Sequence, residues 1–83
     1  MLMGVVAAIH RVRSQAAIRC EDGKYSLIRF SAGSWMPAVS EHVEGELRRL
    51  GFHDLVVCNG VLAHVEVQSY NCSLEFAKAR LMA

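Results

Sequence analysis

The chain has 83 residues, 53% of them hydrophobic, and nine basic against eight acidic side chains leave a formal net charge of +1. A length below the usual range of about 100–150 residues predicts one domain over residues 1–83. High apolar content with almost no net charge excludes intrinsic disorder and a uniformly basic nucleic-acid-binding chain.

The first thirty residues predict three successive strands. Met3–Val12 is apolar and β-branched, which favours a strand, and Ala16–Cys20 reads as a second one. Asp22-Gly23 then predicts a tight hairpin turn, because glycine accepts a positive φ without strain. Lys24–Phe30 alternates between two faces of a third strand. One face would carry Ser26, Ile28 and Phe30, and the other Tyr25, Leu27 and Arg29.

Residues 38–50 fit two different structures. One face of a helix would hold the residues at spacings of four, four and three: Val39, Val43, Leu47 and Leu50. The same segment also alternates as a strand does, with Glu44, Glu46 and Arg48 on the polar side. Gly45 favours the strand, since glycine inside a helix costs about 1 kcal/mol relative to alanine.

The remainder predicts two strands and a terminal helix. Leu55–Cys58 reads as a short buried strand, Asn59-Gly60 as a turn and Val61–Gln68 as the last strand. Ser73 suits the N-cap of a helix over residues 73–82. We expect this helix to dock on the sheet through three apolar side chains that share a face: Leu74, Ala77 and Leu81.

The fold class expected from these elements is mainly β, a small five-stranded OB-like or SH3-like barrel with a short C-terminal helix. The alternative is an α+β fold in which residues 38–50 form a helix. Far-ultraviolet circular dichroism distinguishes the two, because the barrel contains no helix beyond the tail.

Glycines and strand alternation along the chain resemble those of a known group. The matching segments are Gly4-Val5-Val6-Ala7, Ala17-Ile18, Glu21–Ser26, Val43–Leu47, Asn59, Val65-Glu66-Val67 and Cys72-Ser73. Together they resemble short, uncharacterised bacterial proteins with a five-stranded β-barrel of the cold-shock or OB type, over roughly residues 4 to 80. This resemblance implies a fold whose strands 2 and 3 commonly bind oligonucleotides.

Basic residues gather in the first thirty positions. On a small barrel they would lie on neighbouring strands and loops, with one tyrosine among them, and could follow a phosphate backbone. We therefore predict a non-catalytic binding module, with single-stranded nucleic acid as the leading ligand. The candidate residues are Arg11, Arg13, Arg19, Lys24, Tyr25 and Arg29.

A second hypothesis is a structural or interaction protein. A domain this small cannot bury all of its apolar residues, and an exposed apolar patch usually marks an interface. Trp35 and Met36 stand beside the only proline, in a segment expected to be a loop, and are residue types favoured at interfaces. They are the candidates for a homo-oligomer contact or a protein partner.

Enzyme, metal and membrane functions find little support in the sequence. The three cysteines are an odd number without C-x-x-C spacing, which favours buried thiols in a reducing, cytoplasmic compartment. No zinc-ligand spacing is present, and no motif joins a nucleophile to a histidine and a carboxylate. We expect no catalytic residue, no metal, no cofactor and no membrane span.

Overall fold

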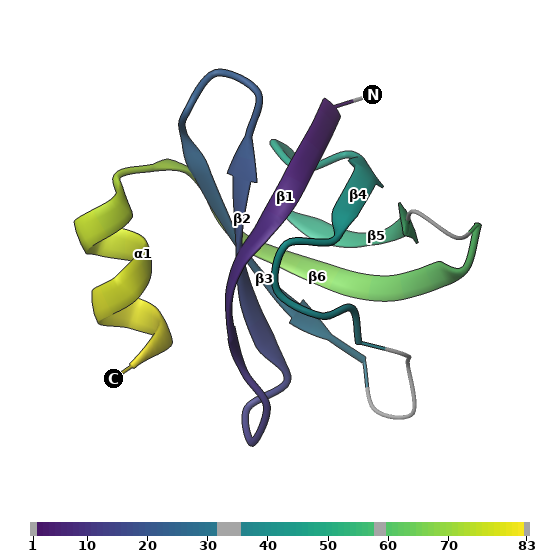
Figure 1. Ribbon diagram of the computed structural model, residues 1–83, viewed down its shortest axis with the longest axis horizontal. Helices are drawn as coiled ribbons and strands as arrows, with labels where there is room; N and C mark the ends of the chain where they lie inside the picture. Colours follow the sequence, from purple (N-terminus) through teal and green to yellow (C-terminus); the bar gives the residue numbers. More distant parts are fainter. Residues whose placement is uncertain (1, 32–35, 58–59, 83) are drawn as a thin grey trace.

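The computed structural model describes residues 2–31, 36–57 and 60–82, which form six strands and one helix (Figure 1). The elements are β1 (Leu2–His10), β2 (Gln15–Cys20), β3 (Tyr25–Phe30), β4 (His42–Gly45), β5 (Gly51–Val57), β6 (Leu62–Cys72) and α1 (Leu74–Leu81). Every strand pair is antiparallel, in the order β1-β2-β3-β6-β5-β4. β4 pairs back with β1, which closes the barrel.

The mainly β class and the C-terminal helix are confirmed, while the strand count is six instead of the expected five. The alternative helix over residues 38–50 is wrong, because His42–Gly45 forms a strand between β1 and β5. Gly45 explains why. A Cβ at this position would lie 2.6 Å from Leu55 Cδ2 and 3.1 Å from the Asp54 carbonyl oxygen, so only glycine allows β4 to approach β5 so closely.

The predicted hairpin of β2 and β3 forms with the expected turn and faces. Gly23 has a φ of +84° in the turn, where an L side chain would be strained. Ser26, Ile28 and Phe30 point into the barrel, and Tyr25, Leu27 and Arg29 point out of it. The barrel interior is filled by the following buried residues: Val6, Ala16, Ile18, Cys20, Ile28, Phe30, Val43, Leu47, Leu55, Ala63, Val65 and Val67.

One buried polar group lies among these apolar side chains. Ser26 is fully buried, and its hydroxyl donates a hydrogen bond of 2.6 Å to the carbonyl oxygen of Leu47. Leu47 follows β4, and its own side chain belongs to the barrel core. The Ser26 hydroxyl therefore ties the chain after β4 to β3 across the barrel interior.

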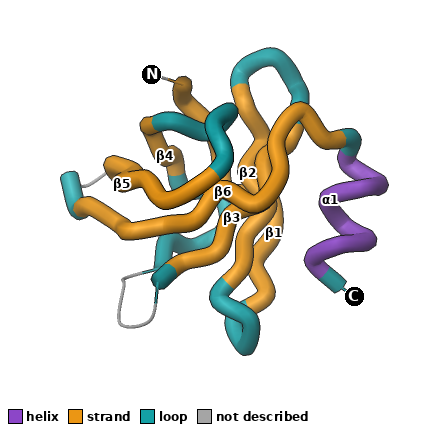
Figure 2. Tube along the Cα trace, turned by 180° about the vertical axis from the view of Figure 1, so that it is seen from behind, coloured by secondary structure: helices purple, strands orange, loops and turns teal. Residues whose placement is uncertain are grey.

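A second apolar cluster lies outside the barrel, where α1 docks. Ala77 and Leu81 of the helix pack on Ala17 of β2 and Leu27 of β3. Leu74, expected on the same face, stays 40% exposed. The helix lies on the opposite side of the molecule from β4 and β5 (Figure 2). The part of the chain that the structure describes contains no helix long and apolar enough to cross a membrane.

Candidate functional site

The predicted nucleic-acid-binding residues fall into two groups at opposite ends of the β2–β3 hairpin. Arg19 pairs with Tyr25 next to the turn that carries Lys24, whereas Arg29 pairs with Gln15 at the far end. Gln15 and Arg19 are four residue steps apart on β2, which is about 13 Å along a strand. Arg11 and Arg13 lie in the turn between β1 and β2, at the Arg29 end.

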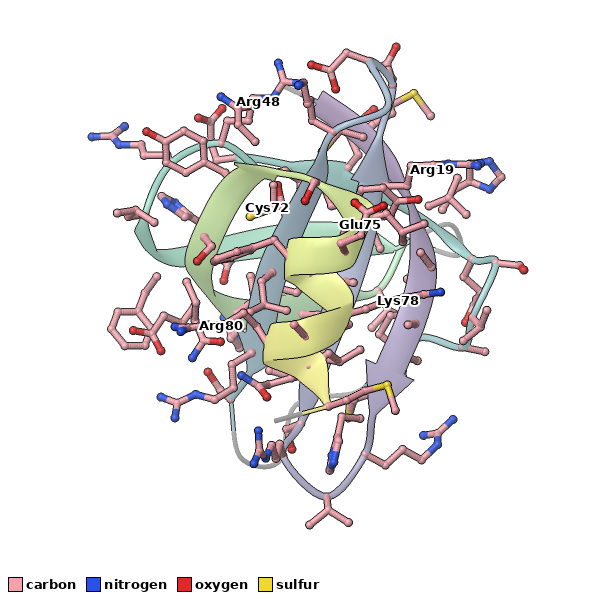
Figure 3. The ribbon with its side chains drawn as sticks, turned by 90° about the vertical axis from the view of Figure 1, so that its left-hand side faces the viewer. Arg19, Arg48, Cys72, Glu75, Lys78 and Arg80 are labelled. Atoms are coloured by element: carbon pink, nitrogen blue, oxygen red, sulfur yellow. The ribbon has the colours of Figure 1, made fainter. Side chains whose placement is uncertain are left out.

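Helix α1 lies between these two groups. The helix lies over the outer face of the β2–β3 hairpin (Figure 3). It covers Ala17 and Leu27 in the middle of that face, and Tyr25 is partly buried against the same cluster. A bound strand therefore cannot follow the hairpin from Arg19 to Arg29 across its centre. The two ends have to be considered as separate surfaces.

Arg13 sits on a turn that is fixed by hydrogen bonds on both sides. Its backbone N–H donates to His10 Nδ1 at 3.3 Å, and the N–H of Ser14 donates to the carbonyl of Arg11 at 3.1 Å. Ser14 has a φ of +54° and accepts a 2.7 Å hydrogen bond from the N–H of Phe30. The main chain of Arg13 is thus held against β3 while its side chain is exposed.

Arg13 lines a first hollow of about 420 Å³ together with residues of β3, β5 and β6. The other lining residues are Ser14, Arg29, Phe30, Ser31, Phe52 and Glu66. Arg29, Glu66 and Phe52 form one row across the three strands, because Arg29 pairs with Glu66 and Glu66 with Phe52. Arg29 Nη2 lies 3.0 Å from Glu66 Oε1, yet its side chain remains 52% exposed. Phe52 is 74% exposed.

Arg13 also lines a second hollow of about 280 Å³, together with Gln15, Leu27, Gln68 and Arg80. The two amides are joined, since Gln15 Nε2 donates to Gln68 Oε1 at 2.8 Å. Arg80 leaves α1 on the side of β6, with its guanidinium carbon 5.7 Å from the centre of the Phe76 ring (Figure 3). We call the two hollows, which share Arg13, the arginine groove.

The sequence reasoning missed several residues of the arginine groove, among them Phe52 and Arg80. Phe52 lies on β5, which begins at Gly51 and not at Leu55 as expected, and only the pairing of β5 with β6 brings it to the hollow that Arg29 lines. Arg80 comes from the terminal helix. No spacing in the sequence links either residue to Arg13. The odd spacing between Phe52 and buried Leu55, which places them on opposite faces of a strand, was the one signal available, and an expected strand start four residues too late hides it.

The opposite end of the hairpin carries mixed charges. Arg19 shares a hollow of about 550 Å³ with Met3, Val5, His42 and Glu21. Glu21 accepts a 3.1 Å hydrogen bond from the N–H of Met3. Asp22, in the same turn as Glu21, forms an ion pair with Arg48 from the segment between β4 and β5. Carboxylates therefore accompany the basic residues here, so this end is a poorer surface for a polyanion than the arginine groove.

Of the two predicted interface residues, the structure describes Met36. Trp35 lies outside the described residues. Met36 is partly buried and packs against the barrel core, and Pro37 beside it is buried. Met36 thus covers part of the core while its side chain remains partly exposed.

The surroundings of the two described thiols keep them protonated or buried. Cys20 and Cys72 are buried and free, and Cys58 lies outside the described residues. Burial raises the pKa of the Cys72 thiol, and the Arg80 guanidinium only partly offsets this. Cys72 is therefore a thiol at neutral pH, not the thiolate that nucleophilic chemistry requires. Within residues 2–31, 36–57 and 60–82, no three His, Cys, Asp or Glu side chains are grouped to hold a metal ion.

Comparison of the chain with protein-family models, curated proteins and solved structures finds no match.

Proposed function

We propose that this protein is a non-catalytic binding module for single-stranded nucleic acid and that the arginine groove is its binding surface. The observation that carries the proposal is the convergence of three arginines and one exposed phenylalanine on adjoining hollows. The four residues are Arg13, Arg29, Arg80 and Phe52. Basic side chains along a groove neutralise phosphates and release counterions, while an exposed aromatic ring stacks on a base.

The charges of the arginine groove favour an anionic ligand. Among the described residues that line the two hollows, Glu66 is the only acidic one, and it is paired with Arg29 at the surface. Exposed ion pairs contribute at most about 1 kcal/mol, so a phosphate can replace Glu66 as the partner of Arg29. Arginine also binds phosphate with two parallel hydrogen bonds, which a lysine cannot do.

The exposed ring of Phe52 favours a single strand over a duplex. Bases in a duplex are already stacked on one another, whereas an unpaired base can lie on an aromatic face. Phe52 is far more exposed than a ring that serves the core, and it borders the hollow between Arg13 and Arg29.

We further propose that the barrel is an OB-like variant. Its first three strands follow one another, and the last strand pairs with the third. The OB type uses strands 2 and 3 for ligands. Here α1 occupies the centre of that surface, so the proposed site is displaced to the end of the hairpin where β2 begins.

A fluorescence titration with a labelled oligouridylate at low salt tests the proposal. The double variant Arg13→Gln/Arg29→Gln should bind about tenfold more weakly or worse, since hydrogen bonds to charged groups are the strong ones. Its salt dependence should also be shallower, by about 0.7 in the log–log slope for each arginine lost.

Two matched variants make this test specific. Arg19→Gln/Lys24→Gln removes the same charge from the opposite end of the hairpin and should change affinity less than about twofold. Phe52→Ala should weaken binding to the single strand by about fivefold or more and leave binding to duplex DNA unchanged. Equal losses in the two double variants would contradict the proposed site, and an absence of binding to the wild-type protein would contradict the function.

A further inference from the structure

We infer that the arginine groove selects RNA over DNA and that Gln15 is the residue that reads the ribose 2′-hydroxyl; the inference rests on the proposed function. Gln15 donates through Nε2 to Gln68, but its Oε1 is buried and accepts no hydrogen bond from the described residues. A buried acceptor without a donor is costly. A ligand that brings a donor to this atom therefore gains affinity from a hydrogen bond that the described residues do not make in the unbound protein.

The chemistry around Gln15 determines what that donor is. Arg13 and Arg80 line the same hollow as the amide, and both guanidinium groups suit a phosphate. Phosphate oxygens only accept hydrogen bonds, so a phosphate cannot satisfy Gln15 Oε1. The 2′-hydroxyl is a donor that accompanies the phosphate at every ribonucleotide, whatever its base, and DNA lacks it.

Access to the amide is provided by the arginines themselves. Arg13 and Arg80 are exposed side chains, and a shift of either guanidinium onto a phosphate opens the hollow around Gln15. Leu27 also lines this hollow, but it is buried under α1 and its side chain has no hydrogen-bond donor for Gln15. The arginines therefore hold the backbone of the ligand, and Gln15 distinguishes its sugar.

The test compares oligouridylate with oligodeoxyuridylate of the same length, which share the base and differ only in the 2′-hydroxyl. The wild-type protein should bind the RNA about two- to tenfold more tightly, the effect of one hydrogen bond. Gln15→Met keeps the length of the side chain and removes the acceptor. It should bind both strands with equal affinity, because the three arginines and Phe52 remain.

Ser69→Ala is the control, since it removes a polar side chain from neighbouring β6 that does not line the arginine groove, and it should keep the preference for RNA. Circular dichroism verifies the fold of both variants. Equal affinities in the wild-type protein, or a preference that persists in Gln15→Met, would overturn the inference and leave the proposed function standing. Binding of neither strand would count against both.

Discussion

At the scale of single residues, the hydroxyl of Ser26 is the polar contact that the barrel interior depends on. Its hydrogen bond to the Leu47 carbonyl is fully enclosed. Ser26→Ala would leave that carbonyl buried without a donor, so we expect the free energy of unfolding to fall by about 1–3 kcal/mol. Urea denaturation measures the change. Ser69→Ala, a half-buried serine on β6, is the control, and an equal loss in both variants would contradict the assigned role.

Cys72 gives the stability of the protein a pH dependence. Burial raises the pKa of its thiol, so the folded protein holds this proton more tightly than the unfolded chain does. The resulting stabilisation is complete below the ordinary thiol pKa of about 8.5 and is lost as the pH rises through the raised value. We expect wild-type stability to fall more steeply above this pH than that of Cys72→Ala. Urea denaturation of both proteins at neutral and alkaline pH measures this, and an equal fall in the free energy of unfolding with pH in the two proteins would contradict it.

At the scale of elements, Gly45 decides whether β4 forms. The sequence does not decide whether residues 38–50 form a helix or a strand, because both periodicities are present. Neither periodicity tells how closely this segment packs against β5. The structure supplies that distance, with no room for a Cβ beside Leu55 and Asp54.

Gly45→Ala should therefore weaken the closure of the barrel by separating β4 from β5. We expect a loss of about 1–3 kcal/mol, typical of inserting a methyl group into a filled site. Glu46→Ala, at the exposed next residue, should stay within about 0.5 kcal/mol of the wild type. Thermal unfolding followed by circular dichroism compares the two. Equal stability of Gly45→Ala and Glu46→Ala would show that the packing of β4 against β5 leaves room for a side chain at position 45.

At the scale of the whole molecule, the fold was more accessible to sequence reasoning than the candidate site. The turn at Gly23 and the alternation over β3 are local signals, because the residues that form each element also determine its conformation. The arginine groove has no local signal. Arg29 and Phe52 line the same hollow only because β3 and β5 both pair with β6, and Arg80 lines the adjoining hollow only because α1 folds back on the hairpin.

The same long-range packing divides the basic surface that the sequence predicts for the hairpin. As a sequence it predicts one continuous face, but α1 divides that face by burying Ala17 and Leu27. The end near Arg19 also carries Glu21 and the Asp22–Arg48 ion pair. Of the basic residues in the first thirty positions, those near Arg13 therefore form the surface best suited to an anionic ligand.

The most direct test of this account is an NMR titration of the ¹⁵N-labelled protein with oligouridylate at low salt. The account predicts shifts of the backbone amides around the arginine groove, in the turn at Arg13, at Arg29 and Phe52 on their strands, and near Arg80 in α1. Amides around Arg19, Lys24 and His42 should stay unchanged. Shifts confined to that opposite end of the hairpin, or no shifts at all, would contradict the central claim that the arginine groove binds single-stranded nucleic acid.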